Sequence, residues 1–289
     1  MGYLFILLFS LLNLGEGIVV KEYAKKHGNG GMIMNAIIAF FSTLFFVVTD
    51  KNGFIIPDGM LPIALINVAM FALGFYFTFV AYQCGPFGLS RLISSFSQLF
   101  TIFYGIFFLN EEAGIMTYVG VALIFVAIAL INFEKQNEND EKQDKGISLK
   151  WILCISVSTV ANGFIGILTR YQQIKFDNSC SNEFQAVSIG GAFIALMAIG
   201  IISERKNLSC VMKNGLLYGL GAGIMNGGKN FLTLLIYLSL PLSIVSPMNT
   251  GLGILLTFAA AFIIYKEKYS KKQLLGVALG TVALLLLVL

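Results

Sequence analysis

The sequence predicts an all-α integral membrane protein with ten transmembrane helices, arranged as two inverted five-helix repeats around a central cavity. Three observations lead to this fold class. Only 12% of the 289 residues are charged, about half of the ~25% found in soluble domains, so most of the surface faces an apolar medium. Apolar runs of the length of a membrane span recur along the chain. One polar linker divides them into two groups of five.

The apolar runs set the expected number of helices. A hydrocarbon core about 30 Å thick requires about 20 residues of α-helix, and each run approaches this length. The expected spans are residues 2–20, 32–48, 60–82, 87–109, 114–132, 151–169, 184–202, 214–236, 241–264 and 273–289. Transmembrane strands would alternate apolar and polar residues over about ten positions. Runs such as 278–289 show no such alternation, so helices are expected.

The linker divides the chain into two similar halves. Residues 134–150 are rich in charge and have no apolar face, which predicts a solvated segment between a first repeat, 1–133, and a second repeat, 151–289. Glu111 and Glu267 stand at the same distance before identical Gly-Val-Ala-Leu runs. This internal match supports a duplication.

Five spans per repeat require the second half to enter the membrane upside down relative to the first. The charged loops agree with this inversion. If loops alternate sides, one side collects Lys51, Arg170 and Lys175, and Arg91 and Lys229 lie within spans. The other side collects fourteen residues: Lys21, Lys25, Lys26, Lys135, Lys142, Lys145, Lys150, Arg205, Lys206, Lys213, Lys266, Lys268, Lys271 and Lys272. The positive-inside rule then places the linker in the cytoplasm and both termini outside, in a multi-pass protein of the plasma membrane.

With ten runs in two halves, the chain resembles the drug/metabolite transporter superfamily, EamA type. The resemblance also rests on the acidic turn before the last helix of each half, at 110–112 and 266–268, and on the glycines of those helices. It implies a cavity between the halves, alternating access, and substrates that range from amino acids and sugars to drugs. It does not imply ATP hydrolysis, and the sequence has no GxxxxGK[ST] phosphate loop.

Lys229 is the first candidate site residue. It lies near the middle of the run 214–236, about 10 Å from the nearer end. A cation at this depth costs about 2.5–3.5 kcal/mol and usually faces a cavity or a partner. Lys229 borders a helical stripe formed by Asn226, Asn230, Thr233 and Tyr237. We therefore predict that these five residues bind substrate. The alternatives are a lysine that extends to the lipid headgroups and an ion pair that only holds helices together.

Glu16 is the candidate coupling residue. A carboxylate within a membrane span can exchange a proton for a cationic substrate, and the four-helix small multidrug resistance relatives carry such a glutamate in their first helix. The local resemblance is limited to the glutamate and a following lysine. The alternative is an interfacial carboxylate paired with Lys21 or Lys25. If Glu16 and Lys229 face one cavity, the two charges suit a zwitterion such as an amino acid.

Hydroxyl and amide side chains are frequent in the fourth and ninth runs. Ser94 and Gln98 are an i, i+4 pair, and Asn249 lies in the ninth run, so we predict that these three also contact substrate. The alternative is that such groups only join helices, as small polar residues often do in membranes. Arg91 follows Pro86 by about one turn and is expected to reach the membrane interface.

The remaining inventory argues against other functions. The four cysteines form no CxxC pair, His27 has no cysteine nearby, and GxSxG is absent, so no metal, cofactor or enzymatic activity is expected. The charges form no basic face for nucleic acid. The predicted function is secondary transport of a small polar or amphipathic metabolite, as an exporter of an amino acid or drug-like solute. Protons are the candidate coupling ion, and the protein is expected to be a monomer or a homodimer in the lipid bilayer. Import of a sugar- or nucleoside-like solute, or a scaffold or sensor role, stays open.

Overall fold

The computed structural model describes residues 2–28, 30–50, 53–109, 114–132, 148–239, 242–266 and 270–286. In these ranges all regular secondary structure is helical. The elements are α1 (Gly2–Lys26), α2 (Gly31–Thr49), α3 (Met60–Cys84), α4 (Phe87–Ser95), α5 (Ser97–Phe108), α6 (Ile115–Asn132), α7 (Leu149–Lys175), α8 (Ser181–Ser203), the 3-10 helix η1 (Arg205–Asn207), α9 (Leu208–Ser239), α10 (Leu242–Ile264) and α11 (Lys271–Leu286).

Within the described residues, six segments are long and apolar enough to cross a membrane. They are α1, α2, α3, the stretch Phe87–Phe108 that contains α4 and α5, α7 and α8. The predicted class, an all-helical membrane protein, is thereby confirmed. The total of ten spans and the inversion stay predictions. Glu111, Glu267 and the linker residues 134–147 lie outside the described residues, so their predicted positions are untested.

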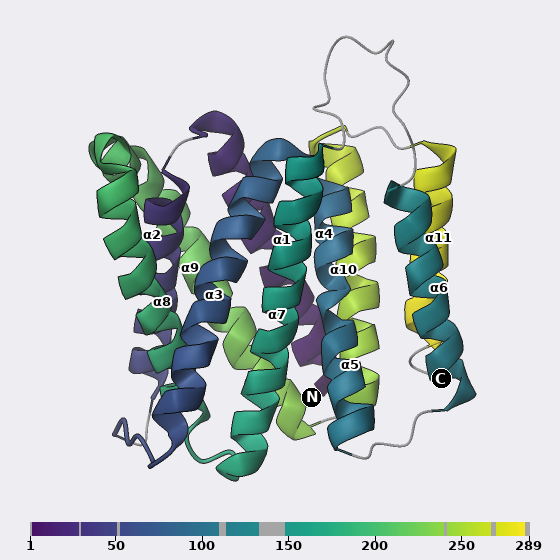
Figure 1. The fold of residues 1–289 in the computed structure, drawn as a ribbon, viewed down its shortest axis with the longest axis horizontal. Coiled ribbons are helices and arrows are strands. Elements are labelled where there is room, and N and C mark those ends of the chain that lie inside the picture. The colour runs from purple at the N-terminus through teal and green to yellow at the C-terminus, as the bar shows by residue number, and fades with distance from the viewer. Residues whose placement is uncertain are drawn as a thin grey trace.

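The helices pack mainly across the two halves of the chain (Figure 1). α1 packs against α9, and α3 packs against α7. α2 packs against α8, α6 against α11, and the stretch α4–α5 against both α7 and α10. Since each of these contacts joins a helix before residue 134 to one after residue 148, the interior of the bundle lies between the halves.

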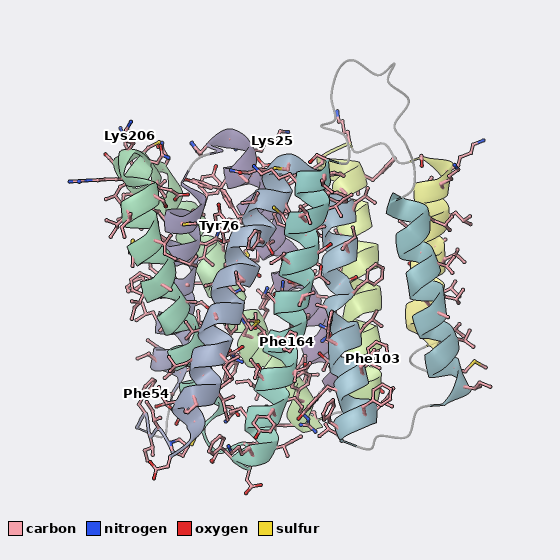
Figure 2. The ribbon with its side chains drawn as sticks, viewed as in Figure 1. Lys25, Phe54, Tyr76, Phe103, Phe164 and Lys206 are labelled. Carbon is pink, nitrogen blue, oxygen red and sulfur yellow. The ribbon has the colours of Figure 1, made fainter. Side chains whose placement is uncertain are left out.

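Two basic residues from opposite halves of the chain share one end of the bundle. Figure 2 shows Lys25, at the end of α1, and Lys206, in η1, at the same end of the molecule. Phe54, which follows α2, lies at the opposite end. Both lysines belong to the basic set that the sequence assigns to the cytoplasmic side.

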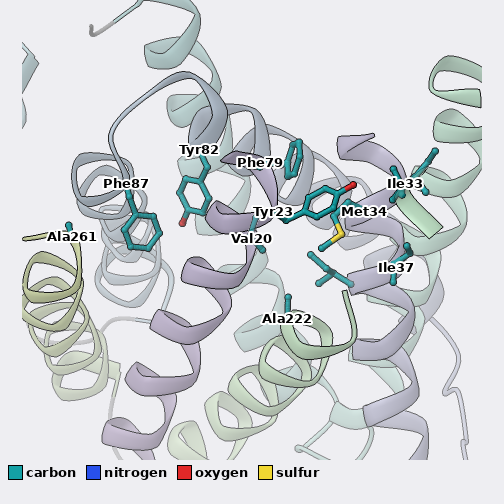
Figure 3. Packing of buried hydrophobic residues seen from close by; sticks show 13 residues of the cluster. Val20, Tyr23, Ile33, Met34, Ile37, Phe79, Tyr82, Phe87, Ala222 and Ala261 are labelled. Atoms are coloured by element: carbon teal, nitrogen blue, oxygen red, sulfur yellow. The ribbon is translucent and has the colours of Figure 1, made fainter. Parts of the chain in front are cut away.

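An apolar cluster fills the end of the bundle that carries Lys25. It joins α1, α2, α3 and α4 to α9 and α10, and Figure 3 shows Tyr23 beside Met34 and Phe87 beside Tyr82. The ring centroids of Tyr82 and Phe87 are 5.3 Å apart. Tyr23 and Phe79 are 1% exposed, so this end of the bundle is closely packed.

A carboxylate from the second half caps a helix of the first. Gly30, with φ 73°, precedes α2 and offers no side chain to its free N–H groups. Glu204, just after α8, takes that role: its carboxylate accepts hydrogen bonds from the backbone N–H of Met32 at 3.1 Å and of Ile33 at 3.2 Å. A negative group at a helix N-terminus is also favoured by the helix dipole. The end of α8 therefore fixes the start of α2.

The span Phe87–Phe108 is broken at Phe96, between α4 and α5. The N–H of Phe96 donates to the Ile93 carbonyl at 3.0 Å, a 3-10 contact in place of the α-helical one. The Thr159 hydroxyl of α7 donates to the Ile155 carbonyl of its own helix at 2.7 Å and lies 3.3 Å from the Ile93 carbonyl. Neither proline nor glycine occurs at the break, and a side chain from the other half of the protein lies beside it.

Candidate functional site: a polar cavity between the two halves

A cavity of about 230 Å³ lies between the halves. Side chains from α1, α2, α3, α4, α5, α7, α8, α9 and α10 line it. Ligand sites for drug-sized molecules usually measure about 300–1,000 Å³, so this cavity is smaller than a typical site of that kind. Its wall is unusually polar for the inside of an apolar bundle, and polar groups in membrane spans usually serve a function.

All of the residues that the sequence predicts for substrate binding or coupling line this cavity. They are Glu16, Ser94, Gln98, Asn226, Lys229, Asn230, Thr233, Tyr237 and Asn249. They come from α1, α4, α5, α9 and α10, which are far apart in the sequence. The fold thus brings them together, and their roles in binding stay predictions.

Glu16 and Lys229 form an ion pair between α1 and α9. Their side chains are 10% and 18% exposed, so the pair is mostly buried while still facing the cavity. Lys229 Nζ also donates to Asn13 Oδ1 at 3.3 Å. The alternative in which Lys229 extends to the headgroups is therefore wrong. The alternative of a pair that holds helices together remains beside the predicted role in binding.

Glu16 is not paired with the interfacial lysines. Lys21 instead donates to the carbonyls of Tyr82 and Gly85, each at 2.8 Å, at the end of α3. The interfacial alternative for Glu16 is therefore also wrong. Glu16 Oε1 accepts a hydrogen bond from Asn226 Nδ2 at 2.8 Å, which fixes the carboxylate from the side of α9.

Asn226 organises the polar stripe of α9. Its Oδ1 accepts hydrogen bonds from Ser42 of α2 at 2.9 Å and from Asn230 Nδ2 at 3.0 Å. Asn226 is 3% exposed, so the amide has little freedom to rotate away. The cavity wall is consequently preorganised through one amide that contacts α1, α2 and its own helix.

Arg91 lies in the cavity wall and not at the membrane interface, which corrects the expectation from the sequence. Its Nη2 donates to the backbone carbonyl of Asn13 at 2.8 Å. A Cβ added at Gly17 would lie 3.3 Å from Arg91 Cζ, so the missing side chain at Gly17 leaves room for the guanidinium against α1.

Several other polar residues of the cavity were not predicted as site residues. They are Asn13, Asn35, Asn162 and Gln185, from α1, α2, α7 and α8. Asn13, Asn35 and Asn162 are single amides within apolar runs, and that isolation is the signal that could have identified them. Gln185 lacks this signal because it follows Asn182 and Glu183 at the start of its run. Among the described residues, no three His, Cys, Asp or Glu side chains gather closely enough to hold a metal ion.

Comparison with known proteins agrees with this architecture. The sequence model of the EamA-like transporter family matches residues 1–133, which is the first predicted repeat. The predicted resemblance to the drug/metabolite transporter superfamily, a class of membrane transporters, is thus confirmed. Over residues 1–133 the chain is similar to the EamA-like transporter family.

A solved structure described only as "Crystal structure of protein" has a similar fold. It is 12% identical in sequence, with a TM-score of 0.61 over 99% of this chain and 94% of that chain. At this identity the likeness concerns the fold alone. No curated protein matches the chain.

Proposed function

We propose that this protein is a secondary active transporter of a small polar or amphipathic metabolite, and that it works as an exporter in the plasma membrane. The observation that carries the proposal is the polar cavity inside an apolar helical bundle, with the Glu16–Lys229 pair in its wall. Ionisable groups in a membrane interior are costly and usually lie on a substrate or ion pathway. A scaffold could use apolar contacts throughout.

The packing of the helices supports two equivalent halves related by inversion. A symmetric relation between the halves would pair α1 with α7 and α3 with α9. Under this relation the α1–α9 contact is equivalent to the α7–α3 contact, and both contacts are present. The contacts of α2 with α8 and of α6 with α11 are unchanged by this relation. Inverted repeats around a central site are the usual basis of alternating access, in which the two halves move against each other. The closed apolar end near Lys25 then represents one of the two access states.

Solute flux through purified protein in liposomes tests the proposal. Vesicles are loaded with a mixture of metabolites, and the loss of each is followed by mass spectrometry against empty vesicles. We expect a restricted set of solutes to leave through the protein. Lys229→Met should slow this loss, whereas Arg205→Gln, which removes an exposed cation of η1, should not.

Two outcomes would change the assignment. If no solute crosses although the reconstituted protein keeps its melting temperature, the scaffold or sensor role replaces transport. If a solute crosses only when an inward gradient is imposed on protein of known orientation, the protein is an importer.

A further inference from the structure

We infer that the transported solute is a singly charged organic anion and that its carboxylate binds at Arg91. This inference rests on the proposed function and narrows it to a class of substrate. It differs from the zwitterion that the Glu16–Lys229 pair alone would suggest.

Arg91 is partly buried and has no anionic partner among the described residues. Within the described ranges, the ion pairs join Lys26 to Glu22 and Lys229 to Glu16, and Arg91 forms none. Its nearest partners are neutral oxygens: the carbonyl of Asn13 at 2.8 Å and, more distantly, the hydroxyl of Tyr82 at 3.5 Å. A guanidinium has five N–H donors, so most of them remain available to a ligand in the cavity.

The charges in the cavity wall do not balance. Among the described lining residues, Glu16, Arg91 and Lys229 are the acidic and basic ones. Glu16 and Lys229 cancel each other, which leaves one positive charge on Arg91. An uncompensated charge away from water is unfavourable, and an anion that binds beside it offsets that cost. A solute with one negative charge makes the occupied cavity neutral, whereas a zwitterion leaves one positive charge and a dianion leaves one negative charge.

A second observation places the anion. Arg91, Ser94, Ser95 and Gln98 are spaced i, i+3, i+4 and i+7 along α4 and α5, and all of them line the cavity. The hydroxyl oxygen of Ser94 is buried and has no hydrogen-bond partner. Arg91 and Ser94 thus offer a guanidinium and a spare hydroxyl one turn apart. A carboxylate can accept two parallel N–H bonds from a guanidinium and a further bond from a hydroxyl.

A set of probes with one carbon skeleton and different charges tests the inference. Pentanoate carries one negative charge, pentanamide none, 5-aminopentanoate is a zwitterion, and glutarate carries two negative charges. Binding to the purified full chain in detergent is measured as the shift in melting temperature across a concentration series, since a ligand stabilises the folded state by RT ln(1 + [L]/Kd). We expect pentanoate to bind about ten- to a hundredfold more tightly than pentanamide and more tightly than the other two.

Variants locate the effect. Arg91→Gln should reduce pentanoate binding about ten- to a hundredfold and remove its advantage over pentanamide. Arg91→Lys keeps the positive charge but cannot donate two parallel N–H bonds to a carboxylate, so it should bind pentanoate with intermediate affinity. If Arg91→Gln does not fold, Arg91→Lys is the variant that tests the inference. Arg205→Gln, the exposed arginine, should behave like the unchanged protein.

The inference is overturned if pentanamide binds as tightly as pentanoate, if 5-aminopentanoate or glutarate binds more tightly, or if Arg91→Gln keeps the preference for pentanoate. These results are separate from the flux test. Flux of neutral or cationic solutes would support the proposed transport function and contradict the inference that the substrate is an anion. Charge-selective binding without flux of any solute would support the anion site and contradict the proposed transport function.

Discussion

The Glu16–Lys229 pair joins the first half of the chain to the second inside the bundle, and each charge keeps the other from being isolated. The Asn13 amide oxygen accepts a hydrogen bond from Lys229, and the Asn226 amide nitrogen donates one to Glu16. A pair of this kind contributes little net stability, because removing two charges from water costs about as much as their attraction returns. Loss of one partner alone is more damaging, since the remaining charge stays without compensation.

A double-mutant cycle on this pair measures how far the two charges stabilise each other. Glu16→Gln and Lys229→Met should each lower the free energy of unfolding by about 1–3 kcal/mol, less than for a fully enclosed pair because both side chains face the cavity. The double variant should lose less than the sum of the two. Thermal denaturation in detergent measures all four proteins. Additive losses would show that the two charges do not stabilise each other.

Proton coupling through Glu16 gives a second prediction. Glu16→Gln keeps the shape and removes the titrating group, so the pH dependence of transport should flatten. Flux in liposomes at a series of pH values measures this. Glu22→Gln is the matched control, because Glu22 pairs with Lys26 near the end of α1 and does not line the cavity. A profile that Glu16→Gln leaves unchanged would assign Glu16 a structural role only.

Individual residues were predicted from the sequence where the signal is local. Lys229 and its stripe are recognisable because a charge and four polar residues recur on one face of an apolar run. Arg91 was misplaced because a position one turn from Pro86 is compatible with either the interface or the interior. What decides is Gly17, on another helix, which leaves space for the guanidinium. No spacing within a single run contains that information.

Close approach between helices depends on glycine at particular positions. A Cβ added at Gly163 of α7 would lie 2.5–2.8 Å from the Cδ2, Cγ and Cβ atoms of Phe100 in α5. Phe100 Cβ is fixed to the backbone and cannot move aside. The contact between α5 and α7 therefore requires glycine at this position.

Gly163→Ala should lower the free energy of unfolding by about 1–3 kcal/mol, the usual cost of overpacking. Gly221→Ala in α9 is its control, because a Cβ there meets no atom within 4 Å. That variant should be neutral or gain up to about 1 kcal/mol from helix propensity. Thermal denaturation of both variants measures the difference. Equal stability would mean that α5 and α7 can separate without cost.

The cap from Glu204 predicts a graded effect on α2. Glu204→Ala removes the acceptor of two backbone N–H groups and should cost about 1 kcal/mol, as other cap deletions do. Glu204→Gln keeps one acceptor oxygen and should lose less. Hydrogen exchange at Met32 and Ile33 reports the local change. Slow exchange at both amides in Glu204→Ala would show that another group satisfies them.

At the scale of helices, the sequence predicts most of the spans but does not predict which helices pack against each other. Apolar length alone defines α1, α2, α3, α7 and α8, because the membrane selects for it. The pairing of α1 with α9 depends on which small and large side chains fit, and both helices have similar composition. The break at Phe96 also has no local marker, because neither proline nor glycine occurs there.

The orientation of the whole molecule follows from its basic loops. We predict both termini on the non-cytoplasmic side, since Lys25 and Lys206 share one end of the bundle and belong to the fourteen basic residues assigned to the cytoplasm. A reporter that fluoresces only in the cytoplasm should stay dark when fused to either terminus and should fluoresce when inserted in the linker 134–150. Bright terminal fusions would reverse the orientation.

The break at Phe96 makes the fourth span easy to bend. A continuous helix is stiff because each turn is tied to the next by backbone hydrogen bonds. At Phe96 this tie is already replaced by a 3-10 contact, so a swing of α4 relative to α5 breaks no α-helical hydrogen bond of the Phe96 N–H. Arg91 lies on one side of this hinge and Gln98 on the other. In the proposed transporter, bending at Phe96 would therefore move Arg91 relative to Gln98 in the cavity wall.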